Sequence, residues 1–253
     1  MSNPILFLGD TTLQTAASYL AGSLANAGWG FDYLASDVAV SEEALTSPKN
    51  LIIISDYPAE NISHSLQASI AKQVQQGTGL LMIGGWESYQ GSGGNWSGTL
   101  VSQLLPVEIA EEDDRQNCDQ PTFIRCKVQH PITNNLPWND RPALIGGYNK
   151  VKAAENATVL LEAERYSASL DDDQTICTMT HQESAPLLVI DDSLPGRVAA
   201  LMTDLAPHWV GPLVDWGPER VCAQADGAEE IEVGNYYMRF VQQLIAWVGR
   251  LDS

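Results

Sequence analysis

Apolar residues in the first half of the chain follow two alternating patterns. Short, continuous apolar runs are typical of buried β-strands, and apolar residues spaced three or four apart are typical of amphipathic helices. Continuous runs also indicate parallel strands that are covered on both faces. The predicted strands are 5–8, 31–34, 51–54 and 80–83.

Helical spacing fills the gaps between these strands. We predict helices over 12–27 and 62–76, each followed by a glycine, and a short capped helix at 41–45. The resulting order predicts an α/β fold with a doubly wound, mostly parallel sheet and right-handed crossovers. Ligands bind such sheets beyond the carboxyl ends of the strands, which here are followed by the loops 9–11, 55–57 and 84–88.

The second half has strand-like segments separated by turns and little helical pattern before residue 231. We interpret it as a β-rich extension of the same sheet, with hairpins, so that residues 1–253 form a single domain. The predicted strands are 107–110, 122–128, a short one at 151, 158–163, 175–179, 187–190 and 198–202.

A final helix is predicted over 233–251, with one broad apolar face. Packing of this face against the sheet is favoured, and a homo-oligomer contact through the C-terminal helix is the alternative. The face comprises Tyr237, Phe240, Val241, Leu244, Trp247, Val248 and Leu251.

The charge balance restricts the classes of partner. With 32 acidic and 13 basic residues the net charge is −19, which disfavours nucleic acids and anionic membranes. The N-terminus lacks the pattern of a signal peptide, and no apolar stretch approaches the roughly 20 residues of a membrane span. We therefore expect a cytoplasmic protein.

Four cysteines stand at 118, 126, 177 and 222. They form no CxxC pair, and no histidine spacing completes a zinc site. We predict free, buried thiols that no activity requires, and neither a metal nor a cofactor.

The turn after the fourth strand has the form of a nucleophile-bearing turn without the nucleophile. In α/β enzymes such a turn exposes a side chain beside backbone N–H groups that hold an oxyanion. Gly85 or Trp86 stands where a cysteine would be, and Ser88 comes two positions later, so a shifted turn stays open as an alternative. We do not expect a glutaminase or hydrolase of the usual kind.

Other polar residues also follow predicted strands. His208 is placed to act as a base, although an ordinary loop histidine is favoured. Asp10 and Asp204 could serve as acid and base or bind a ligand, but helix capping is favoured for both. Asp56 begins Asp-Tyr-Pro, which is typical of a turn.

Aromatic and glycine residues should gather at the same edge. Trp86, Tyr89, Trp96, Tyr148 and Trp209 could form a stacking pocket or could simply close a loop-rich surface. Glycine N–H groups could hold an anion, but the loop has no Lys or Arg and lacks a phosphate-loop ending. The candidate ligand-binding residues are Gly84, Gly85, Trp86, Glu87, Tyr89 and Trp209.

A series of motifs resembles the glutamine amidotransferase-like family of bacteria, which shares its fold with class I glutamine amidotransferases. The resemblance covers nearly the whole chain. Its motifs are 77–89, 98–100, 104–108, 130–132, 146–151, 157–161, 186–190, 196–209 and 237–247.

The resemblance implies the fold more than the activity. The class I enzymes carry a cysteine at the turn and a His-x-Glu after a late strand. Here the cysteine is absent, and Trp209 and Val210 follow His208. An insert at 166–183, with Asp171-Asp-Asp173, is interpreted as an acidic surface hairpin rather than a calcium loop.

Three hypotheses follow, in order of preference. The first is a non-catalytic domain that binds a polar small molecule or a protein partner at the carboxyl end of the sheet. The second is an enzyme of another mechanism, with Asp10, Asp204 or His208 as acid and base, which requires these side chains to converge. The third is a homo-oligomeric assembly protein.

Overall fold

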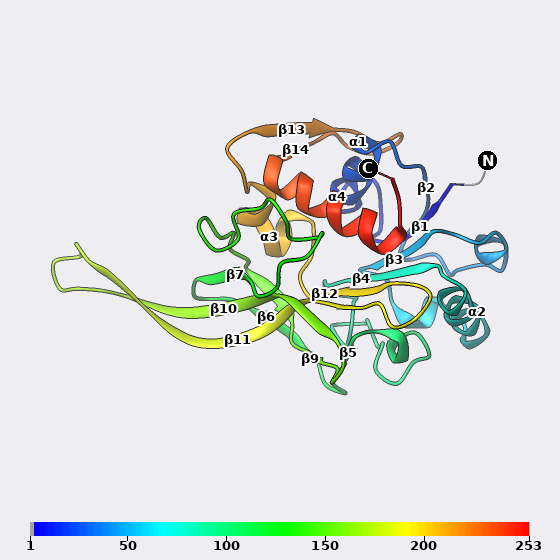
Figure 1. Ribbon diagram of the computed structural model, residues 1–253, viewed down its shortest axis with the longest axis horizontal. Helices are drawn as coiled ribbons and strands as arrows, with labels where there is room; N and C mark the ends of the chain where they lie inside the picture. The colour runs from blue at the N-terminus through cyan, green and yellow to red at the C-terminus, as the bar shows by residue number, and fades with distance from the viewer. Residues whose placement is uncertain (1–2, 253) are drawn as a thin grey trace.

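The computed structural model describes residues 3–252 and is built around one eight-stranded sheet, in the order β2-β1-β3-β4-β12-β11-β10-β7 (Figure 1). Its strands are β1 (Ile5–Gly9), β2 (Phe31–Leu34), β3 (Leu51–Ser55), β4 (Gly79–Ile83), β7 (Thr122–Cys126), β10 (Thr158–Leu170), β11 (Cys177–Asp191) and β12 (Val198–Leu201).

Strands β1, β2, β3, β4 and β12 are all parallel. β1, β3, β4 and β12 are buried along their whole length, as continuous apolar runs require of strands covered on both faces. The predicted α/β class, the mostly parallel sheet and these strand positions are confirmed. The carboxyl ends of the five strands consequently meet along one edge.

The other three strands extend the sheet in antiparallel fashion. β10 and β11 form a long hairpin that projects from the body of the molecule (Figure 1). The sequence predicts two separate strands, 175–179 and 187–190, where the structure has the single strand β11. The connecting residues 180–184 are polar and mostly exposed, so they carry no apolar signal.

Three two-stranded sheets complete the β-structure: β5 (Val107–Glu108) with β9 (Lys152–Ala153), β6 (Arg115–Asn117) with β8 (Gly147–Asn149), and β13 (Arg220–Ala223) with β14 (Ile231–Gly234). The sequence pattern did not predict β6, β8, β13 or β14. They are short, and most of their residues have no alternating apolar pattern.

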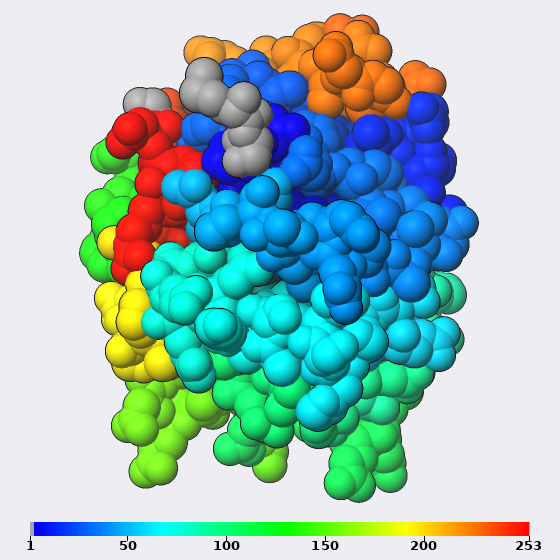
Figure 2. Space-filling model, turned by 90° about the vertical axis from the view of Figure 1, so that its right-hand side faces the viewer, coloured from blue at the N-terminus to red at the C-terminus, as the bar shows by residue number. Residues whose placement is uncertain are grey.

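Helices cover both faces of the parallel part. α1 (Ala17–Asn26) packs against α4 (Asn235–Gly249), and α2 (His64–Gln75) lies across the sheet from them (Figure 1). Seen from the side of β2 and α2, the N-terminal half forms most of the surface (Figure 2). Short 3₁₀ helices span Glu43–Leu45, Ala59–Asn61 and Ser102–Leu104.

Two helices differ from what the sequence predicts. The predicted helix 12–27 begins only at Ala17, because the Thr12 hydroxyl accepts a hydrogen bond from Gln14 N and holds a turn there. α3 (Pro207–Val214) was not predicted. It contains Pro212 and a non-helical residue at Val210, features that interrupt the pattern of a regular helix.

The apolar face of α4 packs inside the monomer, as the sequence favoured. Tyr237, Phe240, Val241 and Leu244 are fully buried, and the Tyr237 hydroxyl donates a hydrogen bond of 2.7 Å to Leu205 O. This face is therefore occupied by the chain's own core. Between residues 3 and 252, no helix has both the length and the apolar character to cross a membrane.

A close contact between β4 and α4 tests this packing. A Cβ at Gly79 would lie 2.2 Å from the carbonyl oxygen of Val248 in α4. We predict that Gly79→Ala lowers the free energy of unfolding by roughly 1–3 kcal/mol, because the helix must move away from the sheet. Urea-induced unfolding measures the change.

Gly211→Ala in α3 is the matched control, because a Cβ there meets nothing within 4 Å. Its effect should be neutral or stabilising by up to about 1 kcal/mol. Equal effects of the two substitutions would contradict the close approach of α4 to β4.

Candidate functional site

Three carboxyl groups converge beyond the carboxyl ends of the parallel strands. Asp10 directly follows β1, Asp56 directly follows β3, and Asp204 stands three positions after the end of β12. Burial, and then the charges of Asp204, Asp56 and Glu87, raise the pKa of Asp10 to about 9. Burial and the Asp204 charge raise the pKa of Asp56 as well. The strands thus bring together carboxyl groups that favour protonation.

Asp10 and Asp56 share an unusual backbone conformation, with φ of +48° and +45°. This left-handed region is costly for most residues but is accessible to aspartate. Asp10 is held there by three hydrogen bonds: its N–H donates to Ser55 O, and its carbonyl accepts from Tyr33 Oη and Ser36 N. Strained positions of this kind gather at functional sites, because the surrounding structure must maintain them.

The Gly84–Ser88 turn holds the Asp56 carboxylate. Glu87 N donates a hydrogen bond of 2.7 Å to Asp56 Oδ1. A Cβ at Gly85 would lie 2.1 Å from the same oxygen, so the carboxylate occupies the space that a side chain would need. Gly85 is therefore required here by the position of Asp56.

Ser88 is not available as a nucleophile. It is fully buried. Its Oγ donates to Ile83 O at 2.6 Å and accepts from Asp56 N at 3.0 Å. Both bonds hold the turn against β4 and the loop after β3, which is a structural role.

Asn149 of β8 fixes the turn from the other side. Its Oδ1 accepts from Gly85 N at 3.0 Å, and its Nδ2 donates to Gly85 O at 3.2 Å and to Asp114 Oδ1 at 2.8 Å. Asp114 Oδ2 in turn accepts from Gln90 N. Sequence reasoning missed this network, because neither residue stands in a motif with recognisable chemistry.

A depression of about 340 Å³ opens beside these groups. Its lining contains carboxylates and hydroxyls but no lysine or arginine. The lining residues are Asp10, Thr11, Ser36, Asp56, Trp86, Glu87 and Ser92. Asp56, interpreted from the sequence as part of a turn, is thus a lining residue. Its place in the loop after a parallel strand is the signal that could have identified it.

Trp86 and His208 meet at this edge. Their ring centroids lie 5.3 Å apart in an edge-to-face arrangement, so His208 lies beside the Gly85–Ser88 turn. Trp86 is 46% exposed, and the Arg115 guanidinium lies 4.9 Å from its ring centroid. His208 itself is exposed, and within residues 3–252 it makes no hydrogen bond to a carboxylate.

Neither of the two aspartates predicted to cap a helix does so: the N-cap of α3 is Ala206, without a side-chain cap hydrogen bond. Asp204 Oδ1 accepts hydrogen bonds from Leu205 N and Ala206 N, directly before α3, at 2.6 and 2.9 Å. These bonds oppose the rise in the pKa of Asp204 that burial causes. Capping by Asp10 was wrong, because α1 begins seven positions later and its cap makes no side-chain hydrogen bond.

The aromatic residues do not form the stacking pocket. Tyr89, Trp96, Tyr148 and Trp209 are buried in the core, which leaves Trp86 exposed. The Tyr89 hydroxyl donates to Leu201 O, and Trp209 Nε1 donates to Asn117 Oδ1. Gly84 is likewise buried, where its N–H donates to Leu201 O.

Metal-binding chemistry is not visible in the part of the chain that the structure describes, since no group of three or more His, Cys, Asp or Glu is arranged to hold an ion. All four cysteines are unpaired, but they are not buried as predicted. Cys177 and Cys222 are exposed, and Cys118 and Cys126 are half-buried.

Comparison with known proteins identifies relatives of the same fold. Residues 8–220 match the model of a family described as "Putative glutamine amidotransferase". A cytoplasmic protein from Salmonella typhimurium aligns with a TM-score of 0.71 and 22% identity, covering 97% of this chain and 98% of its own. A second cytoplasmic protein, from Salmonella typhimurium LT2, aligns at 0.63 and 26%, covering 81% and 89%. No curated protein sequence matches the chain significantly.

The raised pKa of Asp10 predicts how stability depends on pH. Between its ordinary pKa of 3.8 and the folded pKa of about 9, the folded state binds more protons than the unfolded state. The contribution of protonated Asp10 to the free energy of unfolding is therefore fully present below pH 4 and is lost as the pH rises towards 9. We predict that Asp10→Asn raises the free energy of unfolding at pH 8 by more than about 1 kcal/mol, with little effect at pH 4.

Denaturant unfolding at both pH values measures this effect, with the exposed Asp140→Asn as the control that removes one charge elsewhere. A gain at pH 8 that Asp140→Asn reproduces would assign the effect to net charge instead of to the buried site.

Proposed function

The chain belongs to the glutamine amidotransferase-like family, and we propose that it binds a small polar molecule carrying a protonated amine or guanidinium, without forming a covalent intermediate. The observation that carries this proposal is the convergence of Asp10, Asp56 and Glu87 on a depression whose lining has no cationic side chain.

Electrostatics favours a cation in this depression. The carboxyl groups of Asp10 and Asp56 raise one another's energy when ionised, and Asp204 adds to both effects. A cationic group beside them would lower their pKa values, so binding at neutral pH would release protons. In a partly buried site this attraction is stronger than at the surface.

The remaining lining residues suit such a ligand. Thr11 and Ser36 supply hydroxyl groups that can donate or accept hydrogen bonds, and the volume of about 340 Å³ lies at the small end of ligand pockets. Trp86 already holds a guanidinium close to its ring, in the contact with Arg115. In the Gly84–Ser88 turn neither Gly85 nor Ser88 is available as a nucleophile, because Gly85 has no side chain and the Ser88 hydroxyl makes two hydrogen bonds within the fold.

One observation favours acid–base catalysis as a second candidate function. Asp10 has a pKa of about 9, so it is protonated at pH 7 and can donate a proton. The two backbone N–H groups that Asp204 accepts from stabilise its ionised form. Two carboxyl groups in contrasting environments are typical of an acid and a base that work together.

The cytoplasmic location expected from the sequence agrees with the description of the two Salmonella relatives.

We predict that the protein binds agmatine or putrescine with release of protons at pH 7. Isothermal titration calorimetry in two buffers of different ionisation enthalpy measures both the affinity and the proton release. Asp10→Asn and Asp56→Asn should each weaken binding at least about tenfold, which corresponds to roughly 1.4 kcal/mol. Asp140→Asn, far from the depression in an exposed loop, should bind as the native protein does.

Binding that survives both site substitutions, or that a neutral diol analogue equals, would refute the cationic ligand. Turnover of a bound amine that Asp10→Asn abolishes would favour the second candidate.

We also predict that the protein releases no ammonia from glutamine. The turn has no cysteine, and both hydrogen bonds of Ser88 Oγ are used within the fold. A coupled assay for ammonia should give the same background for the native protein and for Ser88→Ala. A signal that Ser88→Ala removes would restore the shifted-nucleophile alternative.

A further inference from the structure

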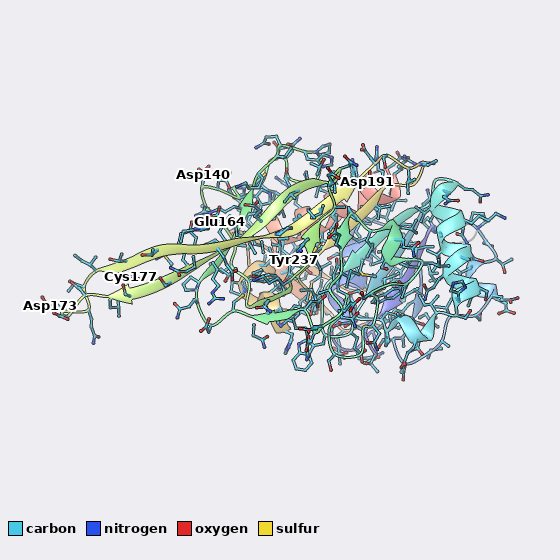
Figure 3. The ribbon with its side chains drawn as sticks, turned by 90° about the horizontal axis from the view of Figure 1, so that it is seen from below. Asp140, Glu164, Asp173, Cys177, Asp191 and Tyr237 are labelled. Atoms are coloured by element: carbon cyan, nitrogen blue, oxygen red, sulfur yellow. The ribbon has the colours of Figure 1, made fainter. Side chains whose placement is uncertain are left out.

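The outer part of the β10–β11 hairpin, residues 166–182, forms a two-stranded ribbon that we call the arm. β7 pairs with β10 only as far as Arg165, and β12 pairs with β11 only from Leu188 onward. Beyond those points the two strands of the arm pair with each other, and near the root Tyr166 N donates to Pro121 O and Ala168 N donates to Gln120 Oε1. Figure 3 shows the arm extending away from the body, with Asp173 at its end and Glu164 at its root. An isolated ribbon of this kind is marginally stable in water.

The two faces of the arm differ sharply. Residues opposite one another in the hairpin share a face, and successive residues alternate between faces. One face consists of Ser and Thr: Ser167, Ser169, Thr178 and Thr180. The other face is largely apolar: Tyr166, Ala168, Leu170, Cys177, Met179 and His181.

The apolar face is open to solvent. Leu170 is 60% exposed and Met179 is 43% exposed. Ile176 beside the tip is 63% exposed, but the alternation places it with Thr178 on the other face. These three are half of the six large apolar side chains exposed among residues 3–252. At the root, the Tyr166 ring packs against Phe123 and His181, so the apolar face is continuous with the body of the protein.

Charge is distributed unevenly along the arm. The tip carries Asp171, Asp172 and Asp173, and residues 166–182 contain no lysine or arginine. The root carries four of the chain's 13 basic residues, each within an ion pair: Arg125 with Glu164, Lys127 with Glu162, and Lys150 and Arg165 with Glu183. The tip is therefore strongly acidic, and the root is close to neutral.

We propose that the apolar face of the arm is a dimer interface, and that its occupant is the arm of a second copy, packed antiparallel about a two-fold axis. A two-fold axis brings the same surface of the two copies together, so the apolar face of one arm would pack against the apolar face of the other. The segment from Tyr166 to Leu170 spans about 17 Å at 3.3 Å per residue. Full antiparallel overlap then brings each acidic tip onto the partner's root, near the copies of Arg165 and Lys150.

The opposite, parallel arrangement is electrostatically unfavourable. It would bring two sets of three aspartates together in a protein whose net charge is already −19. Antiparallel packing separates the tips and also extends the contact from the ribbons onto the roots. The C-terminal helix offers no comparable surface, because its apolar face lies in the core.

Sedimentation equilibrium of the full-length protein tests this proposal. We expect a dimer, and we expect Leu170→Ser combined with Met179→Ser to raise the dimer dissociation constant at least about tenfold. Ser169→Gln combined with Thr178→Gln changes the opposite face, in the single rung between those of Leu170 and Met179, and should leave the dimer intact. Far-UV circular dichroism checks that each variant keeps its fold.

Charge reversal tests the antiparallel orientation. Asp172→Lys combined with Asp173→Lys reduces the net negative charge, which by itself favours association. If the tips lie on the partner's roots near Arg165 and Lys150, the same change must weaken the dimer instead. A native protein that is monomeric at all concentrations, or a dimer that the apolar-face variant leaves unchanged, would overturn the proposal. A dimer that the charge reversal strengthens would overturn the antiparallel arrangement.

Discussion

The hydrogen bond from Glu87 N to the Asp56 carboxylate, for which Gly85 leaves room, organises the side chains at the carboxyl edge of the sheet. It joins the loop after β3 to the turn after β4, and Ser88 and Asn149 hold that turn from two further directions. Asp10 and Asp204 approach from the strands on either side. Their convergence follows from the parallel sheet, which directs strand ends that are distant in sequence to one place. The electrostatic character of the depression depends on this arrangement.

Much of the fold could be predicted from the sequence, because the central strands are continuous apolar runs. The run 51–54, for instance, can be satisfied only by burial on both faces, and it lies in the middle of the sheet. The hairpin could be predicted only in part. Residues 166–170 and 177–180 do alternate apolar with Ser or Thr, but the prediction used this pattern only at 175–179 and ended the preceding strand at 163. α3 was missed since the interior Pro212 and the non-helical Val210 interrupt the pattern of a regular helix.

The candidate site could also be predicted only in part. Residues at predicted strand ends, such as Asp10 and Asp204, could be identified because topology alone places them there. Asp56 also follows a predicted strand, so its place could have identified it, but the contact of its carboxylate with the space above Gly85 could not be predicted. Asn149 and Asp114 come from a segment whose path over the sheet edge no local pattern encodes. The aromatic side chains were harder still, because the same residues can pack inward or outward depending on the loop conformation.

The contact between Asp56 and Gly85 also bears on how this site could be changed. A side chain at position 85 and a carboxylate at position 56 compete for one volume, since the Cβ would lie 2.1 Å from Asp56 Oδ1. A side chain at position 85 could not coexist with this aspartate in the same pose. Replacing Gly85 with cysteine would therefore collide with Asp56, so a nucleophile could be introduced at this position only together with a change at position 56.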